Sequence, residues 1–282
     1  MQGLLEREVR RSIQQALEED EVHEDITSLA CISREEKTEA HFLLKQKAII
    51  AGLPFLPWIF HSVDPSVEFQ FFIEEGEECS SNMILGRLRG PARSLLSLER
   101  TSLNLIQHTS AIATKTQQYV QAVKEFSCDI LDTRKTIPGL RSLQKYAVKV
   151  GGGKNHRFHL KDRFLIKNNH LSQLKKRSSK PITEAIEKAR AFCPGRAIEI
   201  EVETLEMLEE ALAAKAEIIL LDNMSLDMLT RSVLQAKGKA YLEASGGVSL
   251  DNVRDIAATG VDGISIGALT HSICAIDISL RI

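Results

Sequence analysis

The sequence has no excess of positive charge, which argues against a general nucleic-acid binder. Its 282 residues include 36 Lys and Arg against 38 Asp and Glu, giving a net charge of −2. Proteins that bind nucleic acid through its phosphates usually carry a basic excess. The length allows one large domain or two smaller domains with hydrophobic cores.

The cysteines offer no regular metal or disulfide framework. There are five, an odd number, and no two of them form a Cys-x-x-Cys pair. Zinc sites and small disulfide-linked folds usually show such spacings. We therefore interpret the cysteines as reduced thiols of a cytoplasmic protein.

Signals for secretion, membrane insertion and nucleotide binding are also missing. The first 21 residues are charged throughout and lack the apolar core of a signal peptide. The longest apolar run, 48–60, is broken by Gly52, Pro54 and Pro57 and is too short to span a bilayer. Neither a Walker A motif nor a strand-GxGxxG-helix unit occurs, so P-loop and Rossmann folds lack support.

The first part of the chain shows an α+β pattern. Apolar residues recur at helical spacing over 1–20. Residues 39–47, 67–73 and 83–90 have the pattern of strands. Pro91 stands where a helix would begin, and helical stretches follow at 92–107 and 110–125.

From Cys128 onward, strand and helix patterns alternate. Strand candidates occur at 128–133, 163–168, 197–202, 217–223, 240–246 and 263–268, with helical stretches at 204–215, 225–237 and 249–259. Strands that are each followed by a helix predict a parallel sheet. A closed or nearly closed α/β barrel fits this pattern.

Polar and glycine residues follow nearly every predicted strand. The C-terminal ends of barrel strands carry the chemistry of such folds. We therefore expect an active site built from these ends: Asp132, Thr133, Arg134, Lys135, Lys167, Asn168, Asn169, His170, Glu201, Glu203, Asp222, Asn223, Ser245, Gly246, Gly247 and Gly267. A purely structural barrel has no need for such a set.

Two consecutive strand ends predict a phosphate site. The first reads Ser-Gly-Gly at 245–247, and the second ends on Gly267. Glycines let a phosphate approach backbone N–H groups, although either loop alone could simply be a tight turn. At neighbouring strand ends, Glu201 and Asp222 could together hold Mg²⁺, which prefers carboxylate and phosphate oxygens.

Positive charge is gathered in residues 133–160, which contain no Asp or Glu. Arg134 and Lys135 leave a strand end, and His156 and Arg157 follow a glycine-rich loop. Guanidinium groups suit carboxylates and phosphates, so this segment predicts a multiply anionic substrate. Three further cations recur on one face of a predicted helix and are interpreted as solvated: Arg141, Lys145 and Lys149.

Together, these motifs resemble one enzyme family. The chain strongly resembles quinolinate phosphoribosyltransferases in "DTRKTIPGLRSLQKYAVKVGGGKNHRFHL" (132–160), "LIKNNH" (165–170), "EVETLE" (201–206), "LLDNMS" (220–225), "EASGGV" (243–248) and "IGALTHS" (266–272). The resemblance runs from "EDITS" (24–28) to "AIDISL" (275–280). The combination is highly specific, although no single motif would be.

The resemblance implies an α/β fold with an N-terminal α/β sandwich (α+β) domain at 1–110. An open-type α/β barrel of mostly parallel strands would follow at 111–270, and the C-terminal segment, 271–282, would return to the N-terminal domain. It also implies a homodimer that uses Mg²⁺ to transfer phosphoribosyl from phosphoribosyl pyrophosphate to quinolinate with decarboxylation. The products are nicotinate mononucleotide, pyrophosphate and CO₂, as in NAD biosynthesis, and no nucleic acid or membrane partner is expected.

Motif positions in the resemblance also imply residue roles. The substrate-binding residues would be Arg100, Thr133, Arg134, Lys135, His156, Arg157, Lys167, Ser245, Gly246 and Gly267, with Arg100 reaching into the partner subunit's site. The catalytic residues would be Lys135, Glu201 and Asp222, and the two acids would hold Mg²⁺. Three positions depart from the family pattern without removing any of these residues: Ala111, Lys154 and Asn168.

Three other functions stay open. A phosphoribosyltransferase acting on another pyridine-like acceptor would release no CO₂. A barrel aldolase or isomerase would use a Schiff-base lysine such as Lys167. A barrel that only senses a phosphometabolite should have lost some of the cations and acids of the predicted site, all of which are present.

Overall fold

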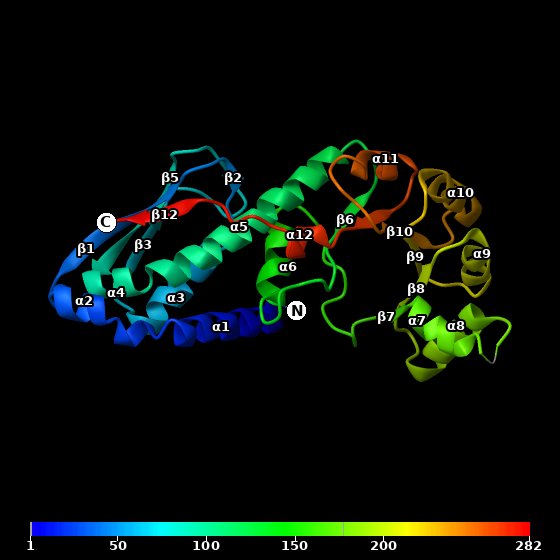
Figure 1. Cartoon of the computed structure of the whole chain (residues 1–282), viewed down its shortest axis with the longest axis horizontal. Coiled ribbons are helices and arrows are strands. Elements are labelled where there is room, and N and C mark those ends of the chain that lie inside the picture. Colours follow the sequence, from blue (N-terminus) through cyan, green and yellow to red (C-terminus); the bar gives the residue numbers. More distant parts are fainter. Residues whose placement is uncertain (1, 177) are drawn as a thin grey trace. The chain divides into compact units, whose positions relative to one another are not determined.

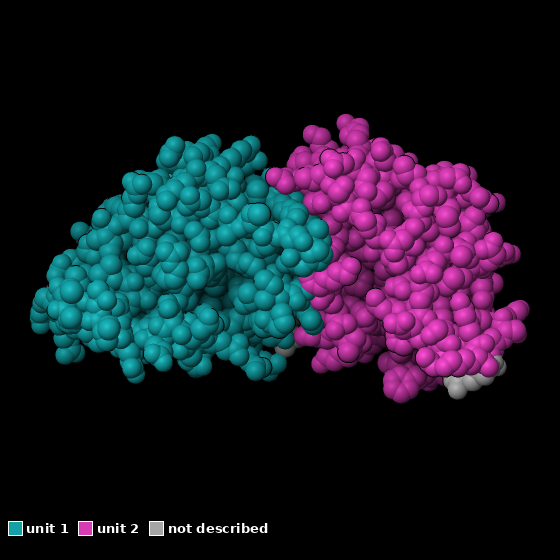
Figure 2. Space-filling model, viewed as in Figure 1, with its two compact units in different colours: residues 1–117, 136–152, 268–282 teal, residues 118–135, 153–267 magenta. Residues whose placement is uncertain are grey.

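The chain divides into two compact units (Figure 2). The computed structural model describes residues 2–176 and 178–282. Unit 1 comprises residues up to 117 with 136–152 and 268–282, and unit 2 comprises 118–135 and 153–267. This division differs from the expected segments 1–110, 111–270 and 271–282, because residues 136–152 belong to unit 1. No helix in the described part of the chain is long and apolar enough to cross a bilayer.

Unit 1 contains an antiparallel sheet with strand order β12-β1-β5-β3 (Figure 1). Its strands are β1 (Lys37–Leu44), β3 (Glu68–Phe71), β5 (Ile84–Pro91) and β12 (Ile278–Arg281), and a separate short ladder joins β2 (Ala48–Ile49) to β4 (Glu78–Cys79). The C-terminal strand β12 pairs with β1, where Leu43 lies opposite Ser279. The end of the chain therefore completes the sheet that its first third begins.

Helices pack against this sheet to form the core of unit 1. They are α1 (Gln2–Glu19), η1 (Val22–Glu24), α2 (Ile26–Cys31), η2 (Leu53–Phe55), α3 (Leu56–Val63), α4 (Ala92–Ser97), α5 (Glu99–Ala122), α6 (Arg141–Val150) and α12 (Ala268–His271). The predicted apolar stripe of α1 is buried at Val9, Ile13 and Leu17, in one cluster with Phe42 and Phe60. The last residues of α5 belong to unit 2.

The helix boundaries predicted after Pro91 are wrong in one respect. The break lies at Leu98, between α4 and α5, and α5 continues through His108 and Thr109 where a gap was expected. The Thr109 hydroxyl donates to the Leu105 carbonyl 2.9 Å away, one turn earlier. Because His108 and Thr109 include no glycine or proline, and the Thr109 hydroxyl bonds within the helix, these polar residues do not interrupt α5.

Unit 2 is built on a parallel sheet, and over the described residues its strand order is β6-β11-β10-β9-β8-β7. The strands are β6 (Asp129–Leu131), β7 (Phe164–Ile166), β8 (Ile198–Val202), β9 (Ile218–Asp222), β10 (Tyr241–Ser245) and β11 (Gly263–Ser265). The first strand pairs with the last, as in a barrel, but β6 and β7 are not paired with each other in the part of the chain described. The predicted fold class, a small α+β domain and an open α/β barrel, is confirmed.

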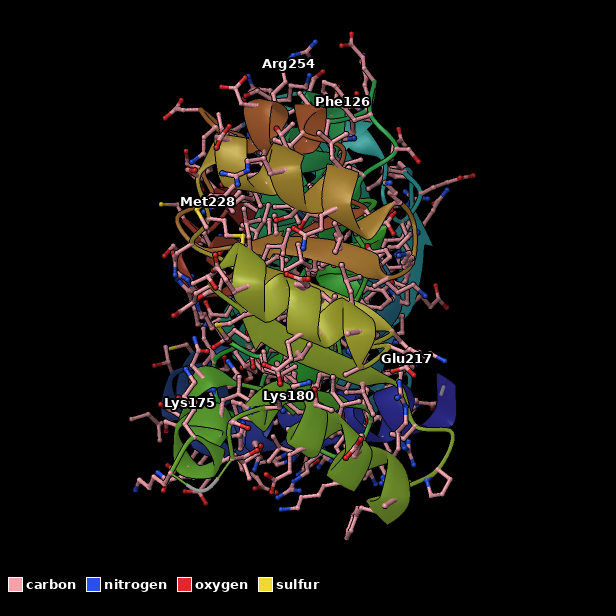
Figure 3. All side chains as sticks on the ribbon, turned by 90° about the vertical axis from the view of Figure 1, so that its right-hand side faces the viewer. Phe126, Lys175, Lys180, Glu217, Met228 and Arg254 are labelled. Carbon is pink, nitrogen blue, oxygen red and sulfur yellow. The ribbon has the colours of Figure 1, made fainter. Side chains whose placement is uncertain are left out.

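Helices follow the barrel strands and cover the outside of the sheet (Figure 1). They are α7 (Asn168–Leu174), α8 (Pro181–Phe192), α9 (Leu205–Ala213), α10 (Leu226–Ala236) and α11 (Val253–Ala258). Thr204 and Ser225 cap α9 and α10 through their side-chain oxygens. On α11, Arg254 lies 5.4 Å from the centre of the Phe126 ring, where it forms a cation–π contact (Figure 3).

The face of α6 that was predicted to be solvated is only partly exposed to solvent. On α6, Lys149 is exposed as expected for a solvated face, but the side chain of Lys145 is 0% exposed. The helix buries Leu143 and Ala147 together with the polar Ser142 and Gln144. The interpretation of Lys145 as a solvated residue is therefore wrong, because α6 is covered around most of its circumference.

Candidate active site

Strand register brings the predicted polar residues to one end of the unit 2 sheet. Asp222 on β9 lies opposite Ser245 on β10, which lies opposite Ser265 on β11. Ser265 in turn lies opposite Leu131, the last residue of β6. Because all these strands are parallel, the residues that follow them meet at the same edge.

Asp132 joins the glycine-rich loop to the end of β6. Its carboxylate is fully buried and accepts from the His156 backbone N–H at 2.9 Å and from Asn155 Nδ2 at 2.6 Å. The backbone adds N–H···O bonds in both directions between this strand end and Lys154. His156 and Arg157 are thereby fixed beside Thr133, Arg134 and Lys135, whose own turn is closed by a bond from the Lys135 N–H to the Thr133 hydroxyl.

Arg157 is a half-buried guanidinium that the surrounding side chains neutralise only in part. Its Nη1 donates to the Arg163 carbonyl at 3.3 Å, and its buried Nε has no hydrogen-bond partner among the described residues. Burial, the neighbouring cation Arg134 and then Arg163 lower the pKa of Arg157, and the carboxylates of Glu199 and Asp162 offset only part of this shift. A partly buried cation held beside other cations is stabilised by a further anion.

Next to Arg157 lies a cluster of ionisable side chains made up of the buried His156, Glu199 and Glu243 and the half-buried Arg163. His156 Nε2 is 3.1 Å from Glu199 Oε1 and 3.6 Å from Glu243 Oε1. Arg163 Nε is 2.9 Å from Glu199 Oε2, and its Nη2 is 3.8 Å from Glu243 Oε2. Both carboxylates thus lie close to the same two basic side chains inside unit 2.

No role in the site was predicted from the sequence for Arg163, Glu199 or Glu243. Glu243 is 1% exposed, and burial, followed by the negative charge of Glu199, raises its pKa to about 7. An available signal was a charged residue inside an apolar strand, as in the "YLEAS" of β10. Such a residue must find a partner within the fold.

The next strand ends bring acids and a lysine together. Lys167 Nζ lies 3.5 Å from Glu201 Oε2, and Asn168 donates its side-chain amide to Glu203 at 2.5 Å. The pKa of Asp222 is raised by its burial and then by the charge of Glu201. Asn168, which departs from the family pattern, acts here as a hydrogen-bond donor, a role that an ionised acid could not take.

These acids fit a hard cation. Glu201 and Asp222 come from adjacent strands, and the charge of Glu201 is close enough to raise the pKa of Asp222. Repulsion between two such carboxylates is relieved when a divalent cation binds both, and carboxylate oxygens are its preferred ligands. The residues present therefore fit Mg²⁺.

The predicted phosphate loop is tied to Asp222 by Asn223. The Asn223 N–H donates to the Ser245 carbonyl at 2.9 Å, and its side-chain amide donates to Asp222 at 2.9 Å. Gly246 has φ +97°, and a Cβ there would clash with Asn223 Oδ1. Only glycine fits this close approach. Gly267 follows β11 by two residues and ends the neighbouring loop.

Arg100 belongs to unit 1, where it lies on α5, whereas the strand-end residues belong to unit 2. Its exposed side chain lines a groove of about 420 Å³ within unit 1, together with Asp20, Asn104 and His108. Gln144 Nε2 lies 3.0 Å from the ring of His108 and also donates to the Thr270 carbonyl. The groove contains none of the other predicted site residues.

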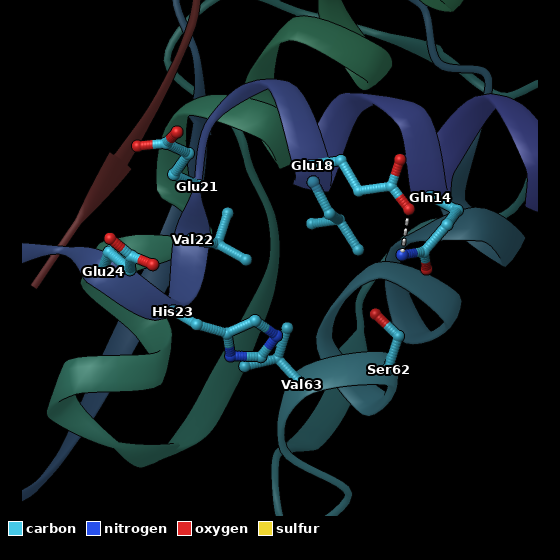
Figure 4. Close-up of a pocket in the computed structure, with 9 residues that line it drawn as sticks. Gln14, Glu18, Glu21, Val22, His23, Glu24, Ser62 and Val63 are labelled. Carbon is cyan, nitrogen blue, oxygen red and sulfur yellow. Dashed lines mark hydrogen bonds between the residues drawn. The ribbon is translucent and has the colours of Figure 1, made fainter.

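A second cavity of unit 1, of about 220 Å³, is acidic (Figure 4). Glu18, Glu21 and Glu24 line it, and Gln14 donates to Glu18 at its edge. A site for a multiply anionic substrate requires the opposite charge, so this cavity does not compete with the strand ends of unit 2.

Family models of two domains match this chain. Residues 25–110 match the quinolinate phosphoribosyl transferase N-terminal domain, and residues 112–281 match the C-terminal domain. These ranges together span nearly the whole chain.

Similar proteins carry corresponding names. A probable nicotinate-nucleotide pyrophosphorylase [carboxylating] of Synechocystis is 42% identical, covering 86% of this chain and 82% of that protein. A quinolinate phosphoribosyltransferase [decarboxylating] of Nicotiana tabacum is 39% identical over 96% of this chain and 81% of its own. The solved nicotinate-nucleotide pyrophosphorylase of Francisella tularensis has a TM-score of 0.90 at 38% identity, covering 98% of this chain and 96% of that one.

Proposed function

Because this chain belongs to the quinolinate phosphoribosyltransferase family, we propose that it converts quinolinate and phosphoribosyl pyrophosphate into nicotinate mononucleotide, pyrophosphate and CO₂. The reaction makes it a decarboxylating pentosyltransferase of NAD biosynthesis. The observation that carries the assignment of the acceptor pocket is Arg157, a half-buried guanidinium beside Arg134 and Arg163 whose buried Nε has no hydrogen-bond partner among the described residues.

Quinolinate carries two adjacent carboxylates, and the cations of unit 2 supply the matching charge. We assign Arg134, Arg157 and Lys135 to the acceptor pocket, with Thr133 shaping the turn that presents them. Guanidinium groups bind carboxylates with two parallel hydrogen bonds and therefore fix the ring as well as its charge.

The chemistry requires positioning and neutralisation rather than a covalent nucleophile. The bond from the ribose carbon to pyrophosphate breaks as the pyridine nitrogen attacks, which leaves the ring positively charged. That ring then accepts the electron pair of the breaking carbon–carboxylate bond, and the carbon takes up a proton as CO₂ leaves. Cations that hold the substrate in line and absorb leaving-group charge lower both barriers.

We assign Glu201 and Asp222 to Mg²⁺ and the ribose, and Ser245, Gly246 and Gly267 to the 5′-phosphate. When bound, Mg²⁺ would neutralise charge on the pyrophosphate group. Lys167 is half-exposed and paired with Glu201, which suits a charged lysine at the pyrophosphate. A Schiff-base lysine would instead have to be uncharged before it reacts.

The direct test is to incubate the protein with Mg²⁺, phosphoribosyl pyrophosphate and quinolinate labelled in its 2-carboxylate. We expect nicotinate mononucleotide and labelled CO₂ in equal amounts. Nicotinate in place of quinolinate tests the alternative acceptor. Product from nicotinate, with none from quinolinate, would contradict the proposal.

We further propose that the enzyme is a homodimer in which Arg100 completes the partner subunit's site. What supports this is an exposed arginine that lines a groove in unit 1, whereas the anion-binding strand ends belong to unit 2. The proposed cytoplasmic location rests on the interpretation of the cysteines as reduced thiols.

Subunit mixing tests the shared site. Arg100→Ala and Glu201→Ala homodimers should each be inactive. Random mixing makes about half of the dimers mixed, and each mixed dimer has one site with both defects and one with none. Activity should recover to about a quarter of wild type. If mass measurement confirms mixed dimers and no activity returns, Arg100 acts within its own chain.

A further inference from the structure

We propose that His156 is a positioning residue: Arg163, Glu199 and Glu243 hold its ring, and the ring fixes Arg157 in the acceptor pocket without contacting quinolinate. This inference rests on the proposed function, in which Arg157 binds a substrate carboxylate. It replaces the role in direct substrate binding that the family resemblance implies for His156.

Both ring nitrogens of His156 already have partners in the protein. Nδ1 accepts the Arg157 backbone N–H at 2.8 Å, and Nε2 lies 3.1 Å from Glu199 Oε1. A nitrogen that accepts an N–H bond uses its lone pair, so the proton of the neutral ring is on Nε2 and is donated to Glu199. The residue is only 7% exposed, which leaves its ring little surface for a substrate.

The same cluster holds Arg157 at two points. Its backbone N–H is bound by the His156 ring, and its Nη1 donates to the backbone carbonyl of Arg163 at 3.3 Å. Arg163 is held in turn through its own side chain, because Nε lies 2.9 Å from Glu199. Removing the Glu199 carboxylate would therefore loosen both supports of Arg157.

A metal ion is a weaker interpretation of these residues. Ligand atoms of His156, Glu199 and Glu243 lie within 4.8 Å of one another, which alone would allow a metal site. However, the Arg163 guanidinium already balances both carboxylates from the same cluster. The cluster therefore holds its own cation, and its geometry points toward Arg157.

Two matched substitutions separate positioning from substrate contact. The side-chain oxygen of His156→Asn can occupy the place of Nδ1 and accept the Arg157 N–H. The side-chain nitrogen of His156→Gln can instead reach Glu199, but this variant offers Arg157 no acceptor. We expect the KM for quinolinate to be roughly tenfold lower in the Asn variant than in the Gln variant, the effect of about one hydrogen bond. The KM for phosphoribosyl pyrophosphate should change less than about twofold in both.

Nitrogen NMR of histidine-labelled protein provides a readout that does not require turnover. The His156 signals, identified by their loss in His156→Asn, should show the neutral Nε2–H form both before and after quinolinate is added. His159→Asn, in the same loop, is the control and should keep wild-type kinetics.

Equal loss of quinolinate affinity in the two His156 variants would overturn the inference, since direct contact by a cationic ring predicts that result. Unchanged affinity in both variants, or an imidazolium form of His156 in the quinolinate complex, would overturn it as well. If the wild-type protein makes no nicotinate mononucleotide, the proposed function fails, but the NMR spectrum still decides the state of His156.

Discussion

Replacing Glu243 with Gln should remove a pH-dependent loss of stability. The Glu243 side chain is 1% exposed, and burial together with the charge of Glu199 raises its pKa from an ordinary 4.5 to about 7. The folded protein therefore keeps this proton between pH 4.5 and pH 7, where the unfolded chain has released it. Because the folded state binds more protons in this window, its free energy of unfolding falls as the pH rises.

The size of the effect follows from the shift. A difference of about 2.5 pKa units corresponds to about 3 kcal/mol once both states are ionised. Between pH 5 and pH 8, roughly 2–3 kcal/mol of this is expressed. The side-chain amide introduced by Glu243→Gln cannot ionise, so the stability of this variant relative to wild type should rise by about that amount over this range.

Urea unfolding at pH 5, 6, 7 and 8 measures this difference. Circular dichroism is the suitable signal, because the single Trp58 belongs to unit 1 and Glu243 to unit 2. Glu209→Gln, which changes an exposed acid on α9, is the matched control and should show no such trend. A constant difference between Glu243→Gln and wild type from pH 5 to pH 8 would refute the reasoning, since Glu243 would then titrate like an exposed carboxyl.

Three further substitutions test the site. Arg157→Ala should lower kcat/KM by roughly 30-fold or more, because it leaves a quinolinate carboxylate unpaired. Arg231→Ala, which changes an exposed arginine, is the control and should keep wild-type kcat/KM. Equal activities of the two variants would contradict the assignment of Arg157 to the acceptor pocket. Asp222→Asn should impair turnover but keep quinolinate binding in a calorimetric titration, so loss of that binding would be inconsistent with its role. Gly246→Ala should raise the KM for phosphoribosyl pyrophosphate by roughly tenfold, through strain at φ +97° and a clash with Asn223; an unchanged KM would exclude the phosphate loop.

Much of the fold could be predicted because the barrel strands are short, apolar and regularly followed by helices. The strands β8 to β10 lie within one or two residues of their predicted ends. The segment between β7 and β8 was harder, since its charged sequence gave no helix prediction although α7 and α8 form there. The prediction that Lys145 is solvated was wrong for a related reason. A helical pattern identifies one buried face and cannot show that a second face is covered.

The strand-end residues could be predicted from parallel topology alone. Once β9, β10 and β11 are parallel, their last residues must lie side by side, as Asp222, Ser245 and Ser265 do. The loop 153–157 is different, since its place depends on the buried carboxylate of Asp132. Its sequence predicts close backbone approach but not the partner that fixes it.

Depth along a strand explains what the sequence could not distinguish. Glu199, Glu201 and Glu203 alternate identically in the sequence, yet Glu199 is fully buried, Glu201 is half-buried and Glu203 is exposed beyond the end of β8. The acid at the strand end, Glu201, can meet a substrate or a metal, whereas Glu199, two residues earlier, needs a partner from the protein. For Glu199 those partners are His156 and Arg163, which no local pattern links to β8. The same alternation therefore gives an acid suited to chemistry at one end of the strand and an acid that positions other residues at the other.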